Sequence, residues 1–309
     1  LLCVCLTLCS CGSNESAEKP SAASSDTVAK DSSPATTAAA GSRDNTPVVL
    51  TGSADGTVTY GNDSVTVDAS HTEEGYLMVS YSGSNSKVKL QITGSDEITY
   101  TYNLHNGYET FPLTSGSGSY TVGVFENIEG TSYSTLFTQA IDVTIQDEFG
   151  PYLYANQYVN FSADSKVISK AMELSASAND DLEVIENVYN YIITNFTYDY
   201  DKAASVQSGY LPDVDKVFTE NTGICFDYAA VMATMLRTQA IPTRLEVGYA
   251  GEEYHAWIST YIKDKGWING IIEFDGTSWN MLDPTFASTS DSPKKFIAQK
   301  SDYITKYVY

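Results

Sequence analysis

The sequence predicts two folded parts, an all-β sandwich followed by an α+β domain. Residues 47–147 consist of short runs in which apolar and polar residues alternate, separated by Gly- and Ser-rich turns. Residues 164–239 carry apolar residues at helical spacing, and residues 243–282 return to strand-like runs. Because helices come first and strands follow, the second part is typical of an α+β layout.

The length and the charge of the chain limit its partners. With 309 residues, the chain can form two domains of ordinary size. It has 17 basic and 39 acidic residues, a net charge of −22, and no basic stripe. This balance argues against a nucleic-acid partner and gives no attraction to anionic lipid headgroups.

The opening stretch LLCVCLTLCSCGSN contains four of the five cysteines. It is too short to span a bilayer and lacks an initiating Met, so residues 1–11 are interpreted as a truncated lipoprotein signal segment. The run Leu8-Cys9-Ser10-Cys11 resembles a bacterial lipobox. That resemblance implies acylation of Cys11 and a lipid anchor in the bacterial cell membrane. The alternative is an ordinary secretory leader, and either interpretation predicts an exported protein.

Residues 12–46 are rich in Ser, Ala and Thr and have almost no large apolar side chain. Such a segment cannot bury enough surface to offset the cost of ordering its backbone. It is predicted to be a disordered tether between the anchor and the folded part.

Residues 47–148 are predicted to form an antiparallel sandwich of immunoglobulin-like type, because turns recur about every ten residues. The region has no Cys pair and no Trp, and its two histidines have no ligand-like companions. It shows no chemistry and is interpreted as a spacer, adhesion or substrate-positioning module. The predicted strands are 57–60, 64–69, 76–82, 87–93, 97–104, 119–126 and 137–146.

Residues 149–309 are predicted to form the α+β domain. Its predicted helices are 164–176, 180–196 and 224–239, and its predicted strands are 243–250, 254–262, 267–274 and 277–282. A Tyr- and Asp-rich loop separates the second and third helices.

Cys225 is the only cysteine beyond residue 11, so no disulfide can form within the body of the chain. It falls in the first turn of a predicted helix, where backbone N–H groups point outward and can lower a thiol pKa. Thr222 and Gly223 just before it provide a cap-capable residue and a flexible one. The charge of Asp227 would oppose a thiolate, and its side chain is expected to face outward.

His255, the only histidine of the second half, follows Cys225 by 30 positions and opens a predicted strand; Asp283 follows His255 by 28. Hairpins could place the strand of His255 beside the strand that ends at Asp283, giving a Cys–His–Asp arrangement. Each residue also has a structural interpretation: a small buried hydrophobe, a hydrogen-bonded core histidine, and an Asp-Pro that ends a strand.

Several short motifs in this region resemble the bacterial transglutaminase-like domain, over about residues 184–286. They are TGIC (222–225), RTQAIPTR (237–244), GY (248–249), HAW (255–257) and DPT (283–285). The resemblance implies a papain-like fold in which Cys225 is the nucleophile, His255 the general base and acid, and Asp283 the group that orients the imidazole. Ala240 stands where the family more often has Gly.

The remaining aromatic and basic residues have weaker signals. Trp257 and Trp279 are candidates for a substrate pocket, although core packing explains tryptophans equally well. Arg237 and Arg244 are expected to hold structure through ion pairs. No phosphate loop or metal-ligand spacing is present, so no cofactor and no metal is predicted.

The sequence therefore predicts an exported, cysteine-dependent acyl-transfer enzyme. It would act through a Cys225 thioester on amide bonds of proteins or envelope peptides, with hydrolysis favoured over cross-linking. The alternative is a surface lipoprotein whose transglutaminase-like domain no longer turns over and serves as a binding scaffold.

Overall fold

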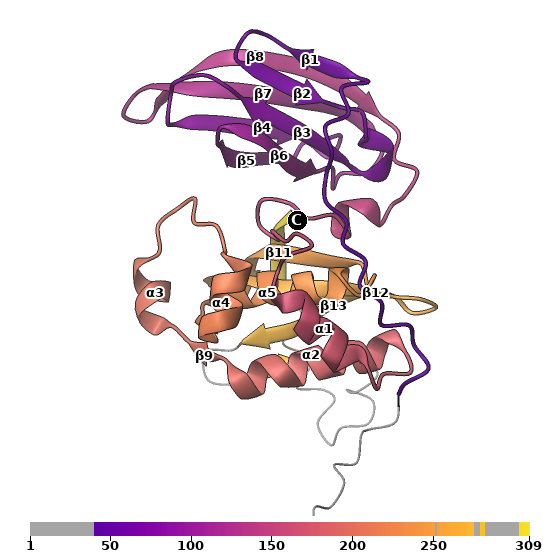
Figure 1. Cartoon of the computed structure of the whole chain (residues 1–309). Helices are drawn as coiled ribbons and strands as arrows, with labels where there is room; N and C mark the ends of the chain where they lie inside the picture. Colours follow the sequence, from indigo (N-terminus) through magenta and orange to yellow (C-terminus); the bar gives the residue numbers. More distant parts are fainter. Residues whose placement is uncertain (1–39, 251, 275–278, 282–302) are drawn as a thin grey trace, which may run out of the picture. The chain divides into compact units, whose positions relative to one another are not determined.

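The structure, a computed structural model, describes residues 40–250, 252–274, 279–281 and 303–309 (Figure 1). The predicted signal segment and most of the predicted tether lie outside these residues. Within the described part of the chain, no helix is both long and apolar enough to cross a membrane.

The first part consists of two four-stranded antiparallel sheets. One has the order β1 (Thr59–Gly61), β2 (Val65–Asp68), β3 (Tyr76–Tyr81) and β6 (Gly107–Pro112). The other has the order β5 (Thr99–Leu104), β4 (Val88–Thr93), β7 (Gly118–Glu129) and β8 (Ser132–Val143).

Alternating sequence patterns explain these sheets. In β4, Val88, Leu90 and Ile92 are buried while the residues between them are half-exposed, as expected for a strand with one face on a core. Inward residues of both sheets, such as Leu77 and Val124, belong to one buried cluster. The immunoglobulin-like type of this region stays a prediction.

The predicted strands correspond to β1–β5, β7 and β8, with two differences. Strand β6 was missed, because the middle of its sequence GYETFP is exposed or half-exposed and gives no alternating apolar pattern. Strand β8 begins earlier than expected, at Ser132, because the long β7–β8 ladder needs only a tight turn at Gly130, whose φ of +55° suits glycine.

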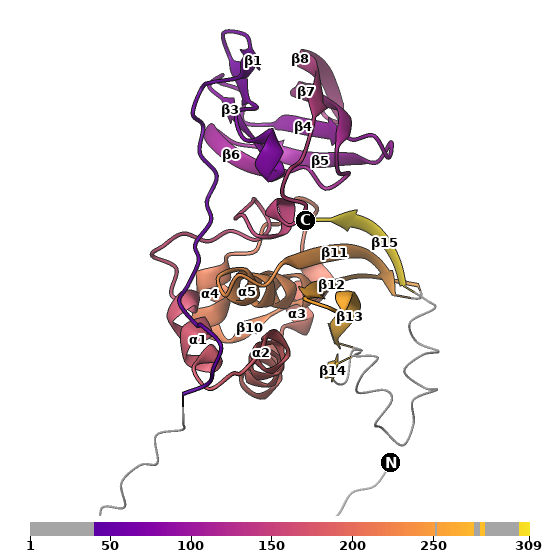
Figure 2. The ribbon, with the colours of Figure 1, turned by 90° about the vertical axis from the view of Figure 1, so that its right-hand side faces the viewer.

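In its described residues, the second part combines five helices with a five-stranded antiparallel sheet. Figure 2 shows the helices beside this sheet. The helices are α1 (Val167–Ser175), α2 (Asp181–Asn195), α3 (Tyr200–Ser205), α4 (Val214–Glu220) and α5 (Cys225–Arg237). The sheet has the order β14 (Trp279–Met281), β13 (Gly266–Phe274), β12 (Glu253–Ile262), β11 (Thr243–Ala250) and β15 (Tyr303–Val308). Two short strands, β9 (Thr197–Tyr198) and β10 (Thr222–Gly223), pair in parallel.

Helix α5 is the central element of this part. Every residue from Asp227 to Arg237 is buried, and the helix contacts α1, α2, α4, β11 and β12. A helix that is buried on all sides has a rigid position, which suits an element whose first residue is the candidate nucleophile.

Helices α3 and α4 occupy the segment predicted as a loop. Both are short and begin with an Asp cap: the carboxylates of Asp199 and Asp213 accept hydrogen bonds from the amides of Lys202 and Lys216. Their apolar pattern is too short to show helical periodicity.

The end of the predicted tether also differs from expectation. Arg43 donates to the Asp181 carboxylate at 2.7 Å and to the Gln239 carbonyl at 2.5 Å, and Ser42 hydrogen-bonds Asn179. These polar contacts fix residues 42 and 43 on the helical part, although their sequence has no apolar residue that would predict it.

Candidate active site

Two short parallel strands and the helix that follows them place Cys225. Gly223 of β10 is in register with Tyr198 of β9, and the chain then enters α5 through Ile224, whose extended backbone makes it the N-cap. The Thr222 hydroxyl donates to the Glu220 carbonyl and does not cap α5, so its predicted capping role is wrong. Cys225 is the first residue of the helix and is half-buried.

Three donors surround the Cys225 sulfur. They are the backbone N–H of Ala256 on β12, the hydroxyl of Tyr198 on β9, and the backbone N–H of Phe226. The backbone N–H of Cys225 in turn donates to the Tyr198 hydroxyl. The thiol therefore sits where β9, α5 and β12 meet.

The sequence analysis did not identify Tyr198 as a site residue. Its place beside the thiol depends on the parallel β9–β10 pair, in which each strand has only two residues. No local signal singled it out: Tyr198 lies three positions beyond the end of α2 at Asn195, and the aromatic residue that directly follows the helix is Phe196.

Burial raises the pKa of the Cys225 thiol; the three donors act in the opposite direction, and the Asp227 charge raises it further. The Phe226 amide at the helix N-terminus acts in the expected direction, but desolvation outweighs the hydrogen bonds, so the net shift of the Cys225 pKa is upward. With its pKa raised, the Cys225 thiol is protonated and neutral at pH 7.

His255 lies on β12 in register with Gly248 of β11. Burial lowers the pKa of His255 to about 4, so its imidazole is neutral at pH 7. Its Nε2 atom is buried and has no hydrogen-bond partner among the described residues. The next residue, Ala256, donates to the Cys225 sulfur, so the structure brings the His255 strand to the thiol.

The third predicted member, Asp283, lies outside the described residues, as does the lipidation candidate Cys11. The strand that leads toward Asp283 is β14, which pairs with β13 through Ile272 and Met281. Because β13 lies between β14 and β12, the prediction that the His255 and Asp283 strands are adjacent is wrong. The inserted β13 hairpin is the reason.

Trp257 is only 2% exposed, and its predicted place in a substrate pocket stays a prediction. Its ring lies nearly parallel to that of His255, with centroids 6.4 Å apart, and meets the edge of Tyr303 at 5.1 Å. Trp257 therefore packs beside the imidazole. Trp279 is part of β14, and its side chain is outside what the structure describes.

Asp227 is fully buried, so the expectation that it faces outward is wrong. Its carboxylate accepts hydrogen bonds from Lys202, Tyr210 and the amide of Ile224. Lys202 and Tyr210 come from the segment that was predicted as a Tyr- and Asp-rich loop.

The two arginines of the motif RTQAIPTR hold structure, and among the described residues they do so without the expected ion pairs. Arg237 is buried and donates to the carbonyls of Tyr154, Thr243 and Tyr309 at 2.7–3.0 Å. Arg244 stacks on the Trp267 ring, 3.7 Å from its centroid.

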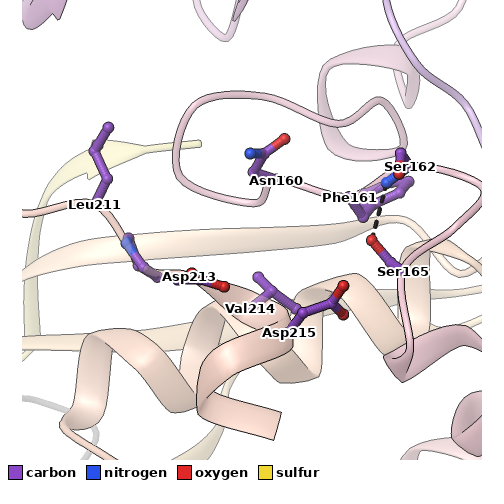
Figure 3. A pocket seen from close by; sticks show the side chains of 9 residues that line it. Asn160, Phe161, Ser162, Ser165, Leu211, Asp213, Val214 and Asp215 are labelled. Carbon is purple, nitrogen blue, oxygen red and sulfur yellow. Dashed lines mark hydrogen bonds between the residues drawn. The ribbon is translucent and has the colours of Figure 1, made fainter. Parts of the chain in front are cut away.

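A surface hollow of about 550 Å³ lies at the start of α4 and is separate from the thiol (Figure 3). Its lining includes neither Cys225 nor His255; it consists of Asn160, Phe161, Ser162, Ser165, Leu211, Pro212, Asp213, Val214 and Asp215. Within the described ranges, no three His, Cys, Asp or Glu residues are grouped as metal ligands.

Comparisons with known proteins each cover part of the chain. Residues 168–270 match the family model of the transglutaminase-like superfamily. An uncharacterised Bacillus subtilis protein, YebA, is 22% identical over 148 residues, which are 41% of this chain and 20% of that protein. The protein-glutamine gamma-glutamyltransferase of Pseudomonas aeruginosa is 32% identical over 69 residues, 18% of this chain and 10% of the relative.

A crystal structure of a candidate cysteine protease from Cytophaga hutchinsonii aligns with 68% of this chain and 72% of its own, at 19% identity and a TM-score of 0.35. The matches to the two curated relatives cover a fifth and a tenth of their lengths. Residues 168–270, which include Cys225 and His255, are similar to the transglutaminase-like superfamily.

Proposed function

We propose that this protein is a cysteine-dependent acyl-transfer enzyme that acts on amide bonds of proteins or envelope peptides, with Cys225 as its nucleophile. One observation carries the proposal: Cys225 opens the buried helix α5, and its sulfur accepts a hydrogen bond from the residue that follows His255. A thiol at a helix N-terminus beside a strand that carries a histidine is the arrangement needed for nucleophilic catalysis.

The chemistry begins with two neutral groups. The Cys225 sulfur attacks the amide carbonyl carbon while the thiol proton passes to the His255 imidazole. The C–N bond then breaks, the amine leaves with that proton, and a thioester remains on the sulfur. Water attacks the thioester, one water proton passes through His255 to the departing sulfur, and a carboxylic acid is released. Asp283 has the orienting role that the family resemblance implies.

Two donors suit the oxyanion of the tetrahedral intermediates. The backbone N–H of Cys225 and the hydroxyl of Tyr198 lie together beside the sulfur. Burial raises the pKa of Tyr198 to about 12, which keeps its hydroxyl protonated and able to donate. Fixed donors at the site of developing charge are typically the largest contribution to acyl-transfer catalysis.

Hydrolysis is favoured over cross-linking because an exported domain is surrounded by water at high concentration.

Casein supplies many different amides for a test in which the substrate is not known. The full chain and its Cys225→Ala variant are incubated with denatured casein, with and without dansylcadaverine. Cys225-dependent release of ammonia or new amino termini, exceeding dye incorporation, supports hydrolysis; dye incorporation in excess supports cross-linking. If the full chain forms neither product in excess of the Cys225→Ala variant, acyl transfer on protein amides is contradicted.

We further propose that the chain is exported and held at the bacterial cell membrane by a lipid on Cys11, with residues 47–148 as an immunoglobulin-like sandwich. The lipobox-like run before Cys11 and the two antiparallel sheets around one core support these assignments. Metabolic labelling with palmitate in a bacterial host tests the anchor: label should enter the wild type and be absent from Cys11→Ser.

A second candidate function is a binding scaffold whose catalytic site no longer turns over. The raised pKa of the Cys225 thiol favours it, as does the His255 Nε2 atom, which has no hydrogen-bond partner among the described residues; a retired site has no need for an activated thiol. The scaffold predicts that iodoacetamide labels Cys225 at the same rate with and without His255, whereas the enzyme predicts slower labelling when His255 is removed.

A further inference from the structure

A buried carboxylate lies beside the candidate nucleophile. Asp227 follows Cys225 by two positions, is 0% exposed, and its charge raises the pKa of the thiol. Burying a charge without a partner is expensive, and this charge opposes the thiolate that attack requires. The groups around Asp227 must therefore compensate its negative charge.

Three donors meet both oxygens of this carboxylate. Lys202 Nζ lies 2.6 Å from Oδ2, the Tyr210 hydroxyl donates to Oδ1 at 2.6 Å, and the Ile224 amide donates to Oδ2 at 2.9 Å. Lys202 Nζ also donates to the Tyr210 hydroxyl at 2.7 Å, which closes the triangle. Among the described residues, Lys202 is the only cation within 4.0 Å of Asp227.

The partners of Asp227 come from a separate segment. Lys202 belongs to α3 and Tyr210 to the stretch between α3 and α4, whereas Asp227 belongs to α5. Gly223 leaves room for the carboxylate, because a Cβ there would lie 2.7 Å from the Asp227 Cβ. The network thus fastens residues 202–210 to the N-terminus of α5.

We infer that Lys202 and Tyr210 are positioning residues for the reaction: they neutralise and hold Asp227, so that the N-terminus of α5 can support a Cys225 thiolate. This inference rests on the proposed role of Cys225 as nucleophile. It makes the reactivity of the thiol depend on the docking of residues 202–210 against α5.

The other titratable groups around this network do not supply the compensation. Tyr198 on β9 and Tyr228 on α5 have raised pKa values because of burial, and His255 on β12 has a lowered one, so all three are neutral at pH 7. Asp199 and Asp213, the caps of α3 and α4, are acidic and interact with Tyr228 and Tyr210 respectively. The charge of Lys202 is therefore the one that balances Asp227.

The test measures iodoacetamide alkylation of the full chain from pH 6 to 10, quantified on the peptide that carries Cys225. Lys202→Met removes the charge but keeps the side-chain length, while Tyr210 and Ile224 still hold the carboxylate. We expect its profile to shift to higher pH by about one unit, which is about tenfold slower labelling at a fixed pH below the thiol pKa. Tyr210→Phe should shift the profile in the same direction by less.

Two controls separate positioning from folding. Lys216→Met removes an exposed lysine whose Nζ lies 3.6 Å from Glu220, and it should leave the profile unchanged. In the Asp227→Asn background, Lys202→Met should shift the profile far less, because the charge to be balanced is gone; thermal melts confirm that each variant is folded.

An unshifted Lys202→Met profile, or an equal shift in the Asp227→Asn background, overturns the inference. Because labelling needs no substrate, a shifted profile without turnover of casein would keep the network and reject the proposed function. Turnover of casein with an unshifted Lys202→Met alkylation profile would keep the proposed function and reject the role of the network.

Discussion

At the scale of single residues, His255 is held in its neutral form by burial, with a pKa lowered to about 4. Above the ordinary His pKa of about 6.5, the lowered pKa does not make the free energy of unfolding depend on pH, because neither the folded nor the unfolded chain binds the proton. Between about 6.5 and 4 only the unfolded chain binds it, so stability falls as the pH falls. Below about 4 both states are protonated and the loss is complete.

We therefore expect the free energy of unfolding to fall by about 2 kcal/mol more in the wild type than in His255→Gln between about pH 7.5 and pH 5. Urea denaturation at the two pH values measures this difference. Equal losses in the two proteins would show that His255 is not buried as a neutral group.

Tyr198 is the residue whose hydroxyl serves both the thiol and the proposed oxyanion. Tyr198→Phe removes only that hydroxyl, so we expect kcat on a casein-derived peptide to fall roughly 100-fold while KM changes little. A rise in KM with unchanged kcat would instead assign Tyr198 to substrate binding. Steady-state kinetics on the full chain distinguishes the two.

At the scale of elements, the C-terminus of α5 explains why glycine would suit position 240, where this chain has Ala240. The Ile241 amide donates to the Leu236 carbonyl at 3.0 Å and the Ala240 amide to the Arg237 carbonyl at 2.9 Å, the hydrogen-bond pattern of a Schellman motif. Ala240 has the left-handed φ of +56° that this motif requires and that glycine adopts without strain.

Ala240→Gly should accordingly stabilise the protein by about 1 kcal/mol, because it removes the strain of a Cβ in the left-handed region. Ala203→Gly within α3 is a matched control and should destabilise by about 0.5–1 kcal/mol, because glycine is a poor helix former. Urea unfolding measures both changes. A destabilising Ala240→Gly would contradict this account of the helix end.

Long periodic elements were predictable from the sequence and short ones were not. The predicted strand 243–250 has the bounds of β11, and the start of α5 was predicted within one residue. By contrast, β9 and β10 have two residues each, too few to show a period.

The same limit applies to the site. Residue type and spacing identified Cys225 and His255, but the roles of Tyr198 and Asp227 arise from the β9–β10 pair and from residues 202–210 folding back on α5. Both are tertiary contacts that leave no local pattern.

At the scale of the whole molecule, Arg237 joins segments that are far apart in the sequence. From the end of α5 it donates to carbonyls of Tyr154, of Thr243 at the start of β11, and of Tyr309. It is 1% exposed, so water cannot replace these donors.

Arg237→Met should therefore lower the free energy of unfolding by on the order of 3 kcal/mol, because buried carbonyls lose their hydrogen bonds. Arg244→Met, which removes a stacked guanidinium over Trp267, should cost about 1 kcal/mol. Guanidinium denaturation ranks the two. Equal costs would mean that the carbonyls find other partners.

The most direct test of the central claim is the rate at which iodoacetamide alkylates Cys225 between about pH 7 and about pH 10 in the full chain and in His255→Ala, followed on the peptide that carries Cys225. The account predicts that wild-type labelling accelerates as the pH rises past the ordinary thiol pKa of about 8.5, and that His255→Ala is labelled at least about tenfold more slowly at neutral pH. Equal rates in the two proteins would contradict a Cys225–His255 catalytic pair.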